Sequence, residues 1–217
     1  CSSKTPKATT APRRTPTTAA SGTQLRLVLD REIFTGSIAP DALLSRLDDL
    51  ALLAPALTIA YRLASAVPSR SLAERVAQTA AVAIDQVVTT RVEHATPDGP
   101  ITLEVAFAWR PGRDEPVVDS FVNYIRSRGH GAHVDGLLDG ITRVIRGRRA
   151  EAVRGLVAIV AVVLADVHFG DPTRDRLMTP AVRPAVAAAT AAALRAAIAR
   201  GVSVPSAAGA RSRRSGG

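Results

Sequence analysis

The sequence predicts an α+β fold of the two-layer sandwich type, in which a mixed sheet of about four to five strands carries helices on one face. Short segments that alternate apolar and polar residues are interspersed with longer segments whose apolar residues recur every three or four positions. The turn sequence Pro97-Asp98-Gly99-Pro100 separates two alternating segments, which should therefore pair as a hairpin. Of the 217 residues 47% are hydrophobic but only 3% are aromatic, so the core must consist mainly of Leu, Val, Ile and Ala.

The first part of the chain contains four predicted elements. They are a strand over 22–30, a helix from Pro40 to Pro55, a strand over 57–61 and a helix from Ser71 to about residue 83. Pro40 suits the first turn of a helix because its missing N–H would have no partner there. Ser71 and Glu74 have the spacing of a capping box, which marks the beginning of the second helix.

Six further elements are predicted in the second part of the chain. They are strands over 87–93, 101–109, 117–125 and 157–167, a helix over 134–147, and a helix that begins at Thr179 and ends at Gly201. The segment 157–167 is rich in β-branched residues and reads as a buried strand. Thr179 has the chemistry of a helix N-cap, and Gly201 that of the residue that follows a helix.

The net positive charge of the chain is concentrated at its two ends. Of the net charge of +9, residues 1–20 contribute four positive charges and residues 201–217 three. We therefore expect three parts: a flexible basic segment over 1–21, one folded domain over 22–200 and a disordered basic tail over 201–217. Basic tails bind nucleic acid by neutralising phosphates, but they are equally typical of solvated chain ends.

The cysteine content and the hydropathy of the chain indicate its cellular environment. The single cysteine, Cys1, excludes an intrachain disulfide and is compatible with a reducing, cytoplasmic environment. A cysteine at position 1 before a Ser/Thr/Pro-rich stretch also leaves a tethered lipoprotein open. The longest strongly apolar run, residues 155–165, is about half as long as a membrane-spanning helix requires, so no membrane partner is expected.

The segment over 120–136, SFVNYIRSRGHGAHVDG, is the densest in chemically active residues. His130 and His133 with Asp135 have a spacing compatible with metal binding, and Ser120 with His133 is a formal nucleophile–base pair. A structural histidine in a glycine-bounded turn is the stronger interpretation for both. No phosphate-binding glycine motif is present either. From these observations together we expect no catalytic residue and no metal site.

Two groups of arginines remain as candidate anion contacts. Arg143, Arg146, Arg148 and Arg149 follow one another at the end of a predicted helix, where they either complement the helix dipole or contact DNA. The polar loop after the strand over 157–167 carries Arg174 and Arg176, and loops at strand ends commonly carry function.

Four stretches resemble, in the same order, one protein family. They are GTQLRLVLDREIF over 22–34, LLSRLDDLALLAPAL over 43–57, SFVNYIRSRGHGAHVDG over 120–136 and FGDPTRDRLMTPAVR over 169–183. Together they are similar to the transducer, or second, domain of the B subunit of bacterial DNA gyrase and topoisomerase IV, the type IIA topoisomerases. The triplet Pro172-Thr173-Arg174 stands where this family has Q-T-K.

The resemblance implies a fold, a function and partners. The fold is the family's transducer fold, of the ribosomal-protein domain 2 type, and the function is to couple ATP hydrolysis to DNA strand passage. The parent enzyme uses ATP and Mg, acts on DNA with a topoisomerase A subunit and forms a B-subunit homodimer. Thr173 and Arg174 would contact the nucleotide, and the family's structural motif is carried by Phe121, Asn123, Gly131, His133 and Gly136.

This chain is expected to be inactive by itself and to bind no cofactor alone, because the family's ATPase and metal-binding cleavage domains have no counterpart in it. The alternative is a stand-alone, non-catalytic module of the same fold that binds nucleic acid or another protein, for which Arg143, Arg146, Arg148 and Arg149 would supply the contacts.

Overall fold

The computed structural model describes residues 30, 32–33, 36, 40–54, 56–57, 59, 71–112, 115–145 and 148–205. Apart from Asp30, the predicted strand over 22–30 lies outside these residues, as do the predicted segment 1–21 and most of the predicted strand over 57–61. Of the tail predicted to be disordered over 201–217, residues 201–205 are described, and Val202 is buried in the core. The chain divides into two compact units, residues 1–39 and residues 40–217. Every described helix and strand belongs to the second unit.

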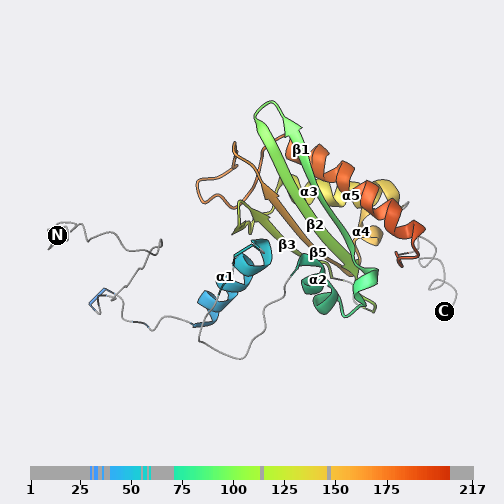
Figure 1. The fold of residues 1–217 in the computed structure, drawn as a ribbon, viewed down its shortest axis with the longest axis horizontal. Helices are drawn as coiled ribbons and strands as arrows, with labels where there is room; N and C mark the ends of the chain where they lie inside the picture. Colours follow the sequence, from blue (N-terminus) through green and yellow to red (C-terminus); the bar gives the residue numbers. More distant parts are fainter. Residues whose placement is uncertain are drawn as a thin grey trace, which may run out of the picture. The chain divides into compact units, whose positions relative to one another are not determined.

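The centre of this unit is a mixed five-stranded sheet with the order β1-β2-β5-β3-β4 (Figure 1). Its strands are β1 (Val88–Thr96), β2 (Gly99–Trp109), β3 (Val117–Val122), β4 (Ile125–Arg126) and β5 (Leu156–Val163). All neighbouring strands are antiparallel except β3 and β5, which are parallel. The predicted hairpin is confirmed, because Thr96 pairs with Gly99 across the turn between β1 and β2.

The strand predicted over 117–125 is interrupted by a tight turn that sequence reasoning missed. Asn123 and Tyr124 have φ angles of 47° and 67°, and β4 then runs back beside β3. The side chain of Asn123 holds this turn against the end of β5: its Nδ2 donates to the carbonyl of Leu164, and the amide of Leu164 donates to its Oδ1, both at 2.9 Å. The predicted strand over 157–167 consequently ends at Val163.

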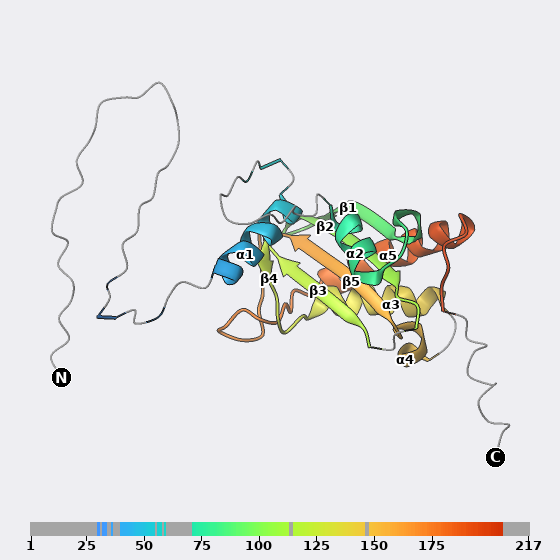
Figure 2. The ribbon, with the colours of Figure 1, turned by 90° about the horizontal axis from the view of Figure 1, so that it is seen from below.

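Helices cover both faces of the sheet, which corrects the expectation of helices on one face. They are α1 (Pro40–Leu53), α2 (Leu72–Ala80), a short 3-10 helix η1 (Ile84–Gln86), α3 (Ala132–Val144), α4 (Arg149–Ala152) and α5 (Val182–Ala199). The helices α3 and α5 lie on one face, and α2 lies on the other with Leu52 of α1 (Figure 2).

The physical reason lies in the central strands. In β5, Ala158 and Val160 face the core beside α3 and α5, whereas Val157 and Ile159 face the core beside α2. Such a strand is apolar at every position because both of its faces are buried. The unbroken apolar run of β5, LVAIVAVV, was the available signal for a second layer of helices.

The helices α3 and α5 pack unusually closely. A Cβ atom on Gly136 would lie 2.5 Å from the carbonyl oxygen of Arg183, and one on Gly140 would lie 2.6 Å from Cβ of Thr190. The sequence indicated Gly136 only as part of the family's structural motif, and the structure shows its role. Gly136 lets the backbone of α5 approach α3.

The ends of α2 and α5 test the predicted capping residues. Ser71 caps α2 as predicted, because its hydroxyl accepts from the amide of Glu74 at 3.2 Å. Gly201 ends α5 as predicted: it has a φ of 93°, and the amide of Val202 donates back to the carbonyl of Ala197 at 3.1 Å. The prediction for Thr179 is wrong, since α5 begins at Val182 and the hydroxyl of Thr179 accepts from the amide of His168 instead.

By length and composition α5 is the one described helix that could cross a membrane. Its Val186, Leu194 and Ala197 are fully buried in the core cluster with α3 and the sheet. That packing is typical of the core helix of a globular domain.

Candidate functional site

A cleft of about 600 Å³ lies between the turn from β3 to β4 and the loop that follows β5. Its walls are formed by residues from 122–127, 165–169 and 173–175. Thr173 and Arg174, which the sequence indicated as nucleotide contacts, lie in this wall. The cleft also contains Asn123 of the structural motif and an arginine that sequence reasoning missed, Arg126.

Arg174 is the cation presented by the loop. Its side chain is exposed and its backbone has a φ of 61°, a conformation that a non-glycine residue rarely adopts. The amide of Arg174 donates to the carbonyl of Asp171 at 3.2 Å. Within the described part of the chain, its guanidinium makes no hydrogen bond or ion pair, so the charge is available to a ligand.

The loop over 171–176, here named the Arg174 loop, is organised by Asp171. One oxygen of this carboxylate accepts from the hydroxyl of Thr173 at 2.6 Å and from the amide of Asp175 at 3.0 Å, and the other accepts from the amide of Arg176 at 3.2 Å. The bond from Thr173 is the main cause that lowers the pKa of Asp171, and the two amides add to it. The hydroxyl of Thr173 thus donates its proton to a carboxylate within the loop.

Arg126 lies in the wall of the cleft but is fully engaged with protein groups. Its Nη2 donates to Oδ1 of Asp49 at 2.8 Å, its Nε donates to Oδ2 of the same residue at 3.2 Å, and its Nη1 bonds to Asp119. Its guanidinium also lies over the ring of Phe121, 4.9 Å from the centroid. Burial lowers the pKa of Arg126, but the hydrogen bonds and charges of Asp49 and Asp119 outweigh it and raise the pKa.

A buried polar network joins Ser127 in the wall of the cleft to Ser120 and His130. The hydroxyl of Ser120 donates to the carbonyl of Ser127 at 2.8 Å and lies 2.9 Å from Nδ1 of His130. The serine–histidine contact therefore involves His130, not His133 as the sequence had suggested. Because Ser120 is 1% exposed, no substrate reaches its hydroxyl, and the pair is structural.

His133 is completely buried in the first turn of α3. Burial, assisted by the nearby His130, lowers the pKa of His133 to about 3, so the ring is neutral at neutral pH. Neither ring nitrogen has a hydrogen-bond partner in the described residues, so packing rather than hydrogen bonding fixes the ring. Those residues also contain no group of three His, Cys, Asp or Glu side chains that could hold a metal ion.

The remaining motif residues, Gly131 and Phe121, have different structural roles. Gly131 has a φ of 114° and forms a bridge with Leu177, and any side chain on it would collide with the backbone of Leu177. The amide of Ala132 donates to the carbonyl of Leu177 at 2.8 Å. Phe121 is 1% exposed and packs in the core cluster beside α2.

The predicted DNA-contacting arginines lie on another part of the surface. Arg143 at the end of α3, Arg148 and Arg149 are exposed, whereas Arg146 lies outside the described residues. Arg149 is 3.6 Å from Asp139 and 4.0 Å from Asp135, so acidic residues of α3 neutralise part of this surface.

Asp139 and Asp135 also bind arginines of α5 and of the Arg174 loop. Nε of Arg183 on α5 donates to Asp139 at 2.8 Å, and Arg176 of the Arg174 loop lies 3.7 Å from Asp135. The bond from Arg183 is the main cause that lowers the pKa of Asp139.

The family model described as DNA gyrase B matches residues 70–204, a range that contains the whole sheet and every described helix except α1. A curated relative, the chloroplastic/mitochondrial gyrase B protein of Nicotiana benthamiana, is 27% identical over 191 residues, which cover 75% of this chain and 26% of that protein.

Two solved structures share the fold. The gyrase B protein from Myxococcus xanthus has 24% identity and a TM-score of 0.59, over 80% of this chain and 57% of that one. The ATP-binding domain of topoisomerase IV from Francisella tularensis, solved with a small-molecule inhibitor, has 20% identity and a TM-score of 0.61, over 79% and 51%. This chain spans about a quarter of its curated relative. Because the family model matches well over half of its residues, the chain belongs to the DNA gyrase B family.

Proposed function

We propose that this chain is the transducer domain of a type IIA topoisomerase B subunit, the part that couples ATP hydrolysis to the passage of one DNA duplex through another. In this proposal Arg174 contacts the terminal phosphate of a nucleotide that another domain of the parent protein binds. The observation that carries it is the exposed Arg174 guanidinium, without a partner among the described residues, on a loop braced by Asp171 at the edge of a cleft of about 600 Å³.

The chemistry of arginine suits this role. A guanidinium forms charge-assisted, bidentate hydrogen bonds to phosphate, and the contact is lost when the terminal phosphate leaves. The Arg174 loop would then be free to shift, which is how many phosphate-dependent switches report hydrolysis. ATP and Mg belong to the parent enzyme in this proposal, together with DNA, a topoisomerase A subunit and a second copy of the B subunit.

The nucleotide as a whole is held by another domain in this proposal, but inorganic tripolyphosphate presents only the phosphate groups that Arg174 would contact, so its binding to the purified chain tests that contact directly. A charge-assisted hydrogen bond is worth about 1.5–3 kcal/mol, so Arg174→Ala should weaken binding by about 10–100-fold in isothermal titration calorimetry. Arg174→Lys should give an intermediate affinity because it keeps the charge but not the bidentate geometry. Arg91→Ala, which removes an exposed arginine from β1, serves as the control and should leave the affinity unchanged. Equal affinities of wild type and Arg174→Ala would refute the assignment.

ATP hydrolysis tests the coupling role. The chain by itself should not hydrolyse ATP, whereas in the full-length parent protein Arg174→Ala should lower the rate of hydrolysis and of DNA supercoiling together. A variant of the parent protein that hydrolyses and supercoils at the wild-type rate would contradict the proposal.

The exposed arginines at the end of α3 and on α4 favour a second candidate function, a stand-alone module that binds DNA. If Arg143, Arg148 and Arg149 contact three phosphates, a rise in salt from about 50 to 200 mM should weaken DNA binding about 40-fold. Changing these three residues and Arg146 to Gln should abolish that salt dependence in a fluorescence anisotropy titration with a DNA duplex. Binding that is insensitive to salt would exclude this candidate.

A further inference from the structure

Besides the apolar packing of Leu52, the contact between α1 and the sheet contains a buried ion pair made by Arg126. Asp49 of α1 is 4% exposed, and both of its carboxylate oxygens accept hydrogen bonds from Arg126 of β4, at 2.8 and 3.2 Å. The third nitrogen of the same guanidinium bonds to Asp119 of β3. One side chain therefore satisfies a buried carboxylate on a helix 77 positions away in sequence.

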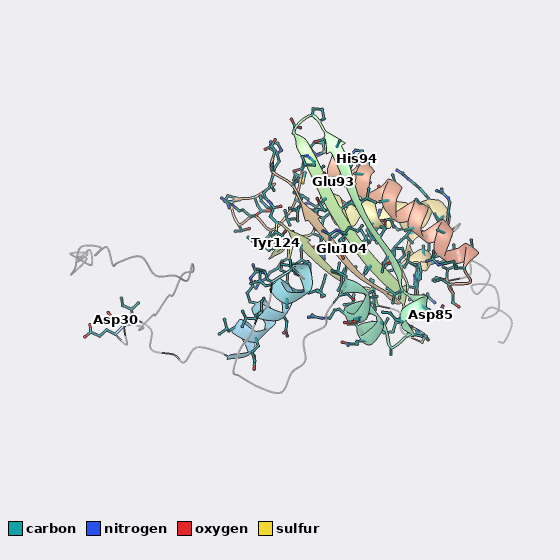
Figure 3. All side chains as sticks on the ribbon, viewed as in Figure 1. Asp30, Asp85, Glu93, His94, Glu104 and Tyr124 are labelled. Atoms are coloured by element: carbon teal, nitrogen blue, oxygen red, sulfur yellow. The ribbon has the colours of Figure 1, made fainter. Side chains whose placement is uncertain are left out.

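A second arginine holds the neighbouring turn of this contact. Nη1 of Arg46 donates to the carbonyl of Tyr124 at 2.7 Å, at the tip of the turn between β3 and β4. Figure 3 shows Tyr124 at this position, next to α1. Thus α1 contacts β4 through polar groups on either side of Ile125.

The residues that follow Arg126 bind the Arg174 loop. The hydroxyl of Ser127 donates to the carbonyl of Asp175 at 2.5 Å, and the amide of Gly129 donates to the same oxygen at 3.0 Å. The amide of Ser127 in turn donates to the carbonyl of Ser120 in β3 at 2.8 Å. The carbonyl of the residue next to Arg174 is therefore fixed by a segment that begins at Arg126.

We propose that Arg126 is a positioning residue that couples α1 to the Arg174 loop, so that the docking of α1 controls the phosphate affinity of the cleft. The regulatory part of this inference rests on the proposed function of Arg174. The mechanical part does not, because it concerns only contacts within the chain. When α1 is displaced, Arg126 loses its bidentate partner, β4 loosens from β3, and the two hydrogen bonds to Asp175 weaken.

The charges at this junction make the coupling all-or-none. Arg126 is the one cation paired with Asp49 among the described residues. A buried carboxylate that loses its cation is strongly destabilised, so Asp49 moves into water together with its helix rather than remaining in place unpaired. The planar guanidinium reaches three carboxylate oxygens at once, which a lysine ammonium on a flexible stem does not reproduce. Docked and undocked α1 are thus two discrete arrangements of the kind that transmit a signal between sites.

Hydrogen exchange followed by mass spectrometry tests the coupling on the unliganded full chain. Arg126→Gln and Asp49→Asn should each raise the exchange rates of α1 and of residues 170–177 together by about tenfold, because both segments open in one local unfolding event. Arg183→Gln is the matched control: it removes another 2.8 Å contact from arginine to aspartate, between α5 and α3, and should leave α1 unchanged. Arg126→Lys should lie between Arg126→Gln and the wild type.

Faster exchange of α1 with unchanged exchange at residues 170–177 would overturn the proposal, even where Arg174 binds phosphate. Asp49→Asn provides the same test without removing Arg126, in case Arg126→Gln fails to fold. The tripolyphosphate titration then addresses the site itself: Asp49→Asn should weaken binding, whereas Arg174→Ala abolishes most of it. If both variants bind tripolyphosphate as tightly as the wild type, the role of Arg174 is refuted. The hydrogen-exchange result then decides the role of Arg126.

Discussion

Replacing Gly140 with alanine should destabilise the protein although alanine is the better helix former. The added Cβ would lie 2.6 Å from Cβ of Thr190 and 2.7 Å from the carbonyl oxygen of Ala187. Neither atom can rotate away, because one belongs to the backbone and the other is fixed to it. Ordinary contact begins near 3.4 Å, so α3 and α5 must separate by about 0.7–0.8 Å to accept the methyl group.

The separation weakens the whole contact between the two helices. A gap of about 0.5–1 Å forfeits about a quarter to a half of the dispersion energy of the atoms involved. Overpacked sites typically cost about 1–3 kcal/mol, and the helix propensity of alanine returns about 1 kcal/mol. Because neither clashing atom can move aside, the cost lies in the upper part of that range, and we expect a net loss of about 1–2 kcal/mol of unfolding free energy. This corresponds to a fall in Tm of about 2–8 °C for a domain of this size.

Thermal and urea denaturation followed by circular dichroism measure this loss. Gly36→Ala is the matched control, because an added Cβ there has no atom within 4 Å, and it should change the unfolding free energy by less than about 0.5 kcal/mol. A Tm of Gly140→Ala equal to or above that of the wild type would refute the reasoning. It would mean that helix propensity outweighs the contact and that α3 and α5 are not closely packed at this position.

Two further predictions concern the joint between β3, β5 and α3. The pKa of His133 is about 3 in the folded protein and 6.5 in the unfolded chain, so the unfolded chain takes up the proton first and stability is lost as the pH falls below 6.5. Urea denaturation should show a loss of about 2 kcal/mol at pH 5 relative to pH 7, and His133→Leu should remove most of it; an unchanged pH dependence in that variant would contradict the assignment. Asn123→Ala removes two hydrogen bonds to Leu164 and places alanine at a φ of 47°, which should cost about 2–3 kcal/mol in the same assay. Asn123→Asp keeps the acceptor for the amide of Leu164 and should cost less, so an equal loss in both variants would argue against the paired hydrogen bonds.

Local patterns identified most of the elements, because each signal depends on neighbours in sequence. The hairpin between β1 and β2 follows from its turn residues, and the ends of α2 and α5 follow from Ser71 and Gly201. The family was also predicted from the sequence, since four stretches in the right order resemble one family. The DNA gyrase B model matches residues 70–204.

The site was only partly readable. Arg174 and Thr173 were indicated by the resemblance, and both lie in the wall of the cleft. Arg126 was missed because an arginine in an alternating segment reads as a solvated position, and its partners Asp49 and Asp119 are far away in sequence or on a neighbouring strand. The contact of Ser120 with His130 was not predicted for a similar reason: the turn that contains Gly129 and Gly131 brings His130, and not His133, to its hydroxyl.

The sequence alone determined most of the described helices and strands, where the net charge lies and which family the chain resembles. It did so because turn chemistry, capping and apolar spacing act over a few residues. Only the tertiary structure decided that Gly136 and Gly140 serve a helix contact and that the guanidinium of Arg126 binds Asp49 of α1. These features depend on atoms brought together from distant positions, where packing and the pairing of buried charge act through space and leave no periodic trace along the chain.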